Sequence, residues 1–197
     1  MASTLLKKVR SIRSLESAWR RVRSNGLMSQ SEEVRIEIER FDENPSRNLR
    51  SLQSRLGHES FKFPPARGIP IPKSNKKDIR PIVLAGVESR IVQRAILNVL
   101  QEIPQLHPFF INPHSFGGIK RQKDDALAAV PAAIKAVLDA IGAGARYVAC
   151  ADISAFFTRI SKESVTKIIA DAVVDDDFMK LLREAIHVEL KNIDDLR

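Results

Sequence analysis

The stretch Arg146-Tyr-Val-Ala-Cys-Ala-Asp-Ile-Ser-Ala-Phe-Phe-Thr-Arg-Ile160 decides the fold that we expect, because it places a carboxylate, Asp152, at the end of an apolar segment. Residues 147–153 are mostly β-branched, aromatic or small, which is typical of a short buried strand. Period two places Val148, Cys150 and Asp152 on one face of that strand. An ionised carboxylate there is costly unless it is paired or binds a metal. Asp152 therefore serves a site, caps the following turn or pairs with an arginine.

The composition of the chain favours a polyanionic partner. Its 197 residues contain 32 Lys and Arg against 24 Asp and Glu, a net charge of +8, and 44% hydrophobic residues provide a core for one or two domains. Nucleic acid is the leading candidate, and solubility is the alternative explanation of the charge. Cys150 is the single cysteine, which excludes an internal disulfide and fits a reducing compartment. Without a membrane-spanning or signal-peptide pattern, we expect a cytoplasmic protein.

The N-terminal part of the chain predicts three short helices. Residues 5–23 alternate apolar and basic residues at helical spacing, and Asn25-Gly26 is expected to end that helix. Ser29 with Glu32 predicts a capping box for the next helix, and Asn44-Pro45 predicts the start of the third. The basic face of the first helix can lie on RNA or a membrane, or it can simply be solvated. Its candidate nucleic-acid contacts are Lys7, Lys8, Arg20 and Arg21.

A proline-rich segment, residues 61–84, predicts a β-hairpin. Its prolines forbid a helix, and its isoleucines favour extended strands at exposed edges. The connection forms a basic tip that includes Lys76 and Lys77. Lys73 and Arg80 flank this tip, and such a pair of cations is suited to binding a triphosphate. A solvated polar turn is the alternative.

Apolar residues at helical spacing over 87–103 predict a helix with a wide buried face, closed by Pro104. An irregular aromatic segment and then a basic cluster follow. The cluster consists of three further candidate nucleic-acid contacts: Lys120, Arg121 and Lys123. The four histidines of the chain lack metal-ligand spacing, so we expect them to be structural.

Three further helical patterns follow, and the last of them is capped by Asp175 or Asp176 and runs from Phe178 to Ile186. Residues 127–141 predict a helix capped by Asp124 or Asp125, in which Pro131 causes either a late start or a kink. Ser161 is expected to cap a helix after the strand that carries the carboxylate. The sequence shows no internal repeat and no low-complexity linker.

Four segments taken together resemble the bacterial reverse transcriptases of the group II intron, retron and defence-associated branches. In chain order they are Ile71-Pro-Lys73 with Arg80-Pro81, Glu88-Ser-Arg-Ile-Val-Gln-Arg-Ala-Ile-Leu97, His114-Ser-Phe-Gly-Gly118 with Asp125-Ala-Leu127, and Ala151-Asp-Ile-Ser-Ala-Phe-Phe157. The first two resemble the fingers hairpin and the helix behind it, and the last resembles the first carboxylate motif of the palm. Leu15-Glu-Ser-Ala-Trp19 also resembles the N-terminal helices of the intron type. The order and spacing of the segments make the resemblance specific.

The resemblance implies an α+β right-hand polymerase fold. We expect an N-terminal helical extension over residues 1–60, a fingers hairpin and helix over 61–110, and the start of an antiparallel-sheet palm over 111–197. The implied activity is RNA-directed DNA polymerisation, in which a dNTP is transferred to a primer 3′-hydroxyl. The implied partners are an RNA template and primer or an RNA/DNA hybrid.

The resemblance also implies two Mg²⁺ ions, which activate the primer hydroxyl and neutralise the phosphates. It makes Asp152 the catalytic metal ligand, together with the backbone carbonyl of Ile153, since magnesium prefers oxygen. The family's later carboxylate motif, an aromatic-x-Asp-Asp hairpin, does not occur in this chain. Val174-Asp-Asp-Asp177 lies too close to Asp152 to replace it and reads as a helix cap. We therefore expect the fingers and the start of a palm, inactive alone and either part of a longer polymerase or encoded short.

The nucleotide-binding roles follow the same resemblance. Lys73 and Arg80 correspond to the residues that bind the incoming triphosphate. Phe157, or alternatively Phe156, corresponds to the bulky residue beneath the sugar, where a 2′-hydroxyl would clash. Core packing is the alternative for either ring. Ile119-Lys-Arg-Gln122 departs from the run of the intron members and leaves the subfamily open.

A second interpretation is a module without activity that binds RNA or a hybrid duplex. Such a module would be completed by another chain or would self-associate through an open sheet edge. A third interpretation, an unrelated basic RNA binder, requires the four ordered segments to coincide by chance. In each of these interpretations, the net positive charge predicts that the chain binds backbone phosphates and that salt weakens this binding.

Overall fold

The computed structural model describes most of the chain: residues 4–72, 79–112, 114–117, 127–153 and 159–192. These residues form two compact units. The first combines the residues up to Leu100 with those from Val173 onward, and the second consists of residues 101–172. The described residues confirm an α+β chain, with many helices and a two-stranded antiparallel sheet. The domain boundaries expected at residues 60 and 110 were placed by sequence motifs, whereas the two units are defined by spatial contacts. These boundaries therefore stay predictions.

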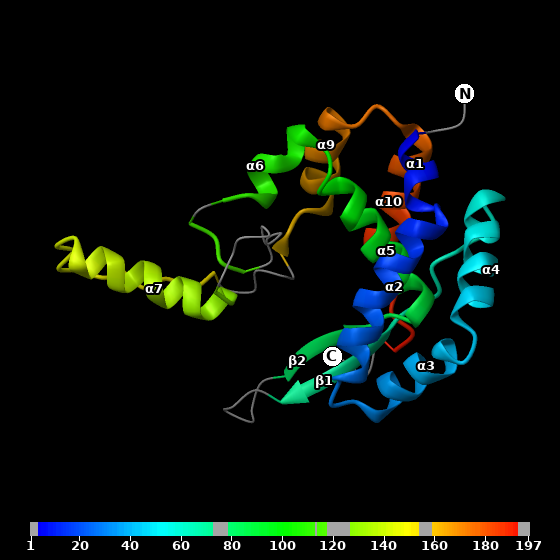
Figure 1. Ribbon diagram of the computed structural model, residues 1–197, viewed down its shortest axis with the longest axis horizontal. Coiled ribbons are helices and arrows are strands. Elements are labelled where there is room, and N and C mark those ends of the chain that lie inside the picture. Colours follow the sequence, from blue (N-terminus) through cyan, green and yellow to red (C-terminus); the bar gives the residue numbers. More distant parts are fainter. Residues whose placement is uncertain (1–3, 73–78, 113, 118–126, 154–158, 193–197) are drawn as a thin grey trace. The chain divides into compact units, whose positions relative to one another are not determined.

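Four helices open the described part of the first unit (Figure 1): α1 (Thr4–Val9), α2 (Ile12–Leu27), α3 (Glu32–Asp42) and α4 (Pro45–Gly57). The single helix predicted over residues 5–23 is therefore divided into α1 and α2. Ser11 marks the division because its hydroxyl caps α2, accepting a hydrogen bond from the Ser14 amide at 3.2 Å.

Side-chain caps also begin the next two helices. Ser31 is the N-cap of α3, accepting a hydrogen bond from the Val34 amide, so the capping box predicted at Ser29 lies two residues too early. The Ser29 hydroxyl instead accepts a hydrogen bond from the Ser31 amide. Asn44 caps α4 as predicted, and the helix ends at Gly57. These caps satisfy amides that have no partner inside the helix.

Gly26 does not end the helix as the sequence predicts, because it lies inside α2 and is buried. A Cβ atom at this position would overlap Cγ1 of Ile38 in α3. The glycine therefore allows α2 and α3 to pack closely. Its missing side chain matters here, and not its freedom to adopt a left-handed conformation.

The core of the first unit surrounds α5 (Val87–Leu100), which α1, α2, α3 and α10 (Asp176–Ile186) contact (Figure 1). The spacing of apolar residues predicted α5, and the helix ends before Pro104 as expected. The largest fully buried side chains of the unit come from these helices and α4: Leu15, Ile38, Leu52, Ile91 and Phe178. Burying them supplies most of the favourable free energy of folding.

Asp175 links the two ends of the first unit. Its Oδ1 caps α10 by accepting a hydrogen bond from the Phe178 amide at 2.9 Å. Its Oδ2 accepts a hydrogen bond from the Leu5 amide of α1 at 3.0 Å. The interpretation of Val174-Asp-Asp-Asp177 as a helix cap is therefore confirmed.

The predicted hairpin is present, as β1 (Arg67–Pro72) and β2 (Ile79–Leu84) (Figure 1). The two strands are antiparallel, and Arg67 lies opposite Leu84 at the base of the hairpin. The residue before β1, Ala66, forms a parallel bridge with Leu190. Segments that are distant in the sequence therefore meet at the base of this hairpin.

The described part of the second unit contains short helical elements and two longer helices: η1 (Pro104–Leu106), α6 (His107–Phe110), α7 (Ala129–Gly142) and α9 (Lys162–Ala172). Ser161 caps α9 as predicted, accepting a hydrogen bond from the Ser164 amide at 3.0 Å. Helix α9 packs on η1, where Leu106 is buried.

Helix α7 starts near the predicted position, and all of its large apolar side chains are exposed. Pro131 lies in its first turn, where a backbone amide has no helical partner, so the proline is tolerated. Its N-cap is Ala128, without a side-chain hydrogen bond. The expected caps, Asp124 and Asp125, lie outside the described residues. No helix in the described ranges is long and apolar enough to cross a bilayer.

The strand predicted over residues 147–153 is wrong, because these residues form neither a helix nor a strand. Tyr147 is 95% exposed and Val148 is 70% exposed. An extended segment gains little without a neighbouring strand to share its backbone hydrogen bonds. In the described part of the chain, the sheet consists of β1 and β2 and offers this segment no partner. Its β-forming composition alone therefore does not make a strand.

Candidate nucleic-acid and nucleotide-binding site

The cations expected to bind a triphosphate belong to the outer end of the hairpin. The backbone of Arg80 lies opposite Ile71, one position from the last described pair of the two strands. Lys73 follows β1 directly in the sequence, but it lies outside the described residues, as do Lys76 and Lys77 of the tip. The strand register thus supports the expectation that Arg80 is close to the tip. Binding to a triphosphate stays a prediction.

The base of the hairpin is fixed by side chains from distant parts of the chain. Arg67 Nη1 lies 2.7 Å from Glu33 Oε2 of α3. The Gly68 amide donates a hydrogen bond to Asn192 Oδ1 at 2.8 Å, and Asn192 Nδ2 donates one back to the Gly68 carbonyl at 2.9 Å. Asn192 thereby satisfies both backbone groups of a buried residue. No local pattern predicts this role of Asn192, because its partner is 124 residues away.

The basic residues of the first two helices are available to a ligand. Lys7 and Lys8 of α1 and Arg20 and Arg21 of α2 are exposed, and their side chains have no partner among the described residues. Arg23 of α2 differs, since its Nε lies 2.7 Å from Asp42 Oδ2. The amphipathic pattern predicted for this region is therefore confirmed. Contact with nucleic acid stays a prediction.

Asp152 and Ile153 are exposed in the second unit. The described residues contain no group of three or more His, Cys, Asp and Glu side chains that could hold a metal ion. One carboxylate and one carbonyl are too few for the octahedral oxygen coordination of Mg²⁺. The residues present therefore do not fit a complete two-metal site, and Asp152 and Ile153 stay candidate ligands.

The remaining predicted contacts lie outside the described residues. Phe156 and Phe157 were expected beneath the sugar of the incoming nucleotide. The basic cluster after the aromatic segment was expected to contact nucleic acid: Lys120, Arg121 and Lys123. The roles of these residues stay predictions.

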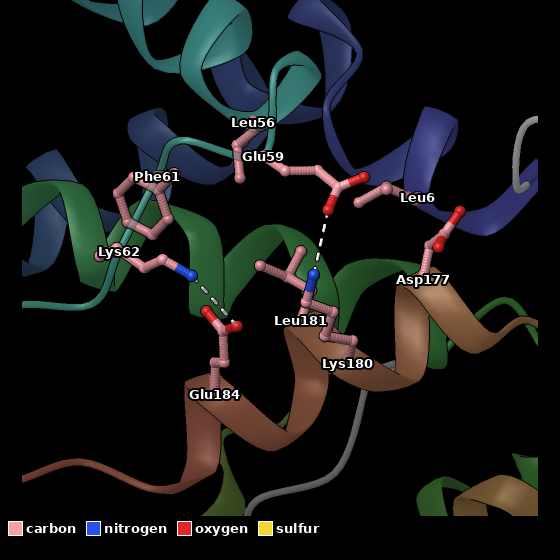
Figure 2. Close-up of a pocket in the computed structure, with 9 residues that line it drawn as sticks. All are labelled: Leu6, Leu56, Glu59, Phe61, Lys62, Asp177, Lys180, Leu181 and Glu184. Carbon is pink, nitrogen blue, oxygen red and sulfur yellow. Dashed lines mark hydrogen bonds and ion pairs between the residues drawn. The ribbon is translucent and has the colours of Figure 1, made fainter.

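A shallow hollow of the first unit lies between α1, the segment after α4, and α10 (Figure 2). Its apolar lining comes from Leu6, Leu56, Phe61 and Leu181. Two exposed ion pairs cross it: Glu59 with Lys180 at 3.0 Å, and Lys62 with Glu184 at 3.6 Å. The first pair lowers the pKa of Glu59 and raises that of Lys180, in each case mainly through their hydrogen bond. Because both lysines are paired, this hollow offers a phosphate no free cation.

Helix α5 carries two arginines that the sequence-based prediction missed. Arg90 Nη1 and Arg94 Nε are buried and have no hydrogen-bond partner in the described part of the chain. Burial lowers the pKa of Arg94, and the positive charge of Arg21 lowers it further. The available signal was the spacing of two arginines four residues apart within an apolar helical pattern.

Comparison with known proteins adds no assignment, since no family model matches the chain and no curated protein is significantly similar to it. The chain's own residues and their arrangement therefore carry the functional interpretation.

Proposed function

We propose that this chain forms the fingers and the beginning of the palm of an RNA-directed DNA polymerase. The hairpin β1–β2 carries the proposal, because Arg80 lies near its outer end and α5 follows it directly. This is the order that the resemblance to reverse transcriptases implies. In the proposed reaction a primer 3′-hydroxyl attacks the α-phosphate of a dNTP and displaces pyrophosphate.

The proposed roles of the residues follow from their charge. Lys73 and Arg80 neutralise the triphosphate and orient it through charge-assisted hydrogen bonds. Asp152, with the carbonyl of Ile153, provides hard oxygen ligands of the kind that Mg²⁺ prefers. The remaining carboxylates come from another part of the polymerase. The exposed position of Asp152 supports this assignment, since it leaves the carboxylate accessible to further ligands.

A primer-extension assay of the polymerase that contains this chain tests the proposal. Asp152→Ala is expected to abolish extension and to leave template binding near that of the wild type, because the change removes one metal ligand. Asp171→Ala is the matched control, since Asp171 is an exposed aspartate of α9. Retained extension by Asp152→Ala would remove the polymerase assignment, as would equal losses in both variants.

A module that binds nucleic acid without catalysis is the second candidate function. The exposed, unpaired basic residues of α1 and α2 favour it: Lys7, Lys8, Arg20 and Arg21. Such a module would bind a short RNA duplex with little sequence preference, and salt would weaken the binding steeply. If the protein that contains this chain binds the duplex but does not extend a primer in the presence of Mg²⁺ and dNTPs, this second function is favoured.

A further inference from the structure

Helix α5 concentrates the unsatisfied polar atoms of the described chain. The buried side-chain nitrogen and oxygen atoms that lack a partner there are Ser89 Oγ, Arg90 Nη1 and Arg94 Nε, and all of them belong to α5. Native proteins pair almost all such atoms, so each exception requires an explanation. Two of these atoms belong to guanidinium groups, which remain charged even when they are partly buried.

Arg90 and Arg94 lie on one face of α5, because residues four apart in a helix are neighbours. Both side chains are half-buried. Helix α2 packs against α5 (Figure 1), and the charge of its exposed Arg21 acts on Arg94. The pKa of Arg94 lies below its ordinary value, first because of burial and then because of Arg21. Two helices thus bring three guanidinium groups into one region.

Carboxylates do not neutralise this region in the described part of the chain. Glu88, the acidic residue of α5, forms its ion pair with Arg55 of α4. Arg90, Arg94 and Arg21 form no ion pair with any residue that the structure describes. Like charges that are held together and partly desolvated destabilise a protein unless an anion binds between them. Among the described residues, the three guanidinium groups therefore lack an anionic partner.

We propose that Arg90 and Arg94, with Arg21, form a site for a phosphate group of a nucleic-acid backbone. Guanidinium groups fit the tetrahedral oxygens of phosphate, because their N–H groups form a planar fork. Arg20 and Arg21 of α2 are exposed, so this helix extends the exposed positive charge beyond Arg90 and Arg94. A polynucleotide is the occupant that this extension favours, since it offers successive phosphates. The site rests on the nucleic-acid binding proposed above and not on the polymerase chemistry.

A double variant tests the site in the 197-residue chain. Arg90→Gln with Arg94→Gln removes both forks and keeps side chains of similar length. Arg47→Gln with Arg50→Gln is the matched control, because it removes the same charge from exposed, unpaired positions of α4. Affinity for a short RNA duplex is measured against salt concentration, and the Tm is measured without ligand and with inorganic phosphate.

The site predicts three results for the double variant. Its affinity for the duplex falls by roughly tenfold to a hundredfold per arginine, as for charge-assisted hydrogen bonds. Its log–log salt slope falls by about 0.7 to 0.9, which corresponds to one lost phosphate contact. Its Tm without ligand stays equal or rises, because unpaired partly buried charges are gone. A purely structural role of the two arginines predicts a lower Tm instead.

Five further outcomes decide the proposal. If inorganic phosphate raises the Tm of the wild type but not that of the double variant, the site is supported. If the wild type binds the duplex and free phosphate does not change its Tm, the phosphate that the site binds is one presented by a polynucleotide. Equal losses in the double variant and the control would overturn it, as would an unchanged affinity in the double variant. If the double variant unfolds, Arg94→Lys is measured in its place, because lysine keeps the charge and removes the planar N–H fork. A wild-type affinity of Arg94→Lys for the duplex would overturn the proposal. None of these results depends on primer extension, so the polymerase assignment can fail separately.

Discussion

The hairpin β1–β2 and the segment 147–153 have similar sequence patterns, but only the hairpin forms strands. Both are rich in residues that favour extended structure. In the hairpin, each strand pairs with the other along its whole length. Hydrogen bonds of Ala66 and Asn192 also connect the base of the hairpin to distant segments. The segment 147–153 has no such partner in the described part of the chain, and Tyr147 and Val148 are exposed. The difference shows that pairing, rather than composition, determines whether a strand pattern becomes a strand.

The largest expected change in the free energy of unfolding comes from removing a buried aromatic ring, in contrast to an exposed one. Phe178→Ala is expected to destabilise the first unit by about 3 to 5 kcal/mol, because the phenyl ring is fully buried in the core. Tyr147→Ala is its control, since this ring is exposed, and its expected effect lies within about 0.5 kcal/mol. Urea unfolding measures both values. A comparable loss from Tyr147→Ala would show that the segment 147–153 is buried in solution.

The next effect compares two helical glycines. Gly26→Ala is expected to cost about 1 to 3 kcal/mol, because the new methyl group would overlap Ile38. Gly142→Ala in α7 has no heavy atom within 4 Å of its new Cβ, so it should leave stability unchanged or raise it by up to about 1 kcal/mol. Thermal unfolding of the two variants tests this contrast. Equal stability of both would mean that α2 and α3 are less closely packed than the structure shows.

The third effect concerns the base of the hairpin. Asn192→Ala leaves the buried amide and carbonyl of Gly68 unpaired and is expected to cost about 1 to 3 kcal/mol. Hydrogen exchange at β1 should accelerate more than exchange at α4, because only the hairpin loses an anchor. Asn48→Ala, which removes one hydrogen bond to Phe41, is the control. If exchange at β1 stays unchanged, the anchoring role of Asn192 is wrong.

Local signals in the sequence predicted most of the helices correctly. The caps at Asn44, Ser161 and within Val174-Asp-Asp-Asp177 were predicted because capping depends on a side chain within three residues of the amide that it binds. The same rule did not distinguish Ser29 from Ser31, since both are suitable caps. The role of Gly26 could not be predicted, because it depends on the approach of another helix.

The candidate site was predictable to a smaller extent. The basic face of α1 and α2 followed from helical periodicity, and the hairpin followed from its prolines and isoleucines. The unpaired state of Arg90 and Arg94 could not be predicted, because it depends on which carboxylates pair elsewhere, as Glu88 does with Arg55. The exposure of Asp152 depends likewise on a missing strand partner. Pairing and exposure of these side chains depend on neighbours that are distant in the sequence, so the sequence alone did not predict them.

The smallest expected effect concerns the exposed ion pair between Glu59 and Lys180 (Figure 2). Their hydrogen bond, and then their charge attraction, lower the pKa of Glu59 below its ordinary value of 4.5. The stability that this carboxylate contributes is therefore present above that value and is lost as the pH falls through its folded-state pKa. Lys180→Met should lower the Tm slightly near neutral pH, and the difference from the wild type should disappear in acid. Lys167→Met, an exposed lysine without a partner in the described chain, is the control. A Tm difference for Lys180→Met that persists in acid would mean that the side chain contributes through the packing of its stem and that its charge contributes nothing.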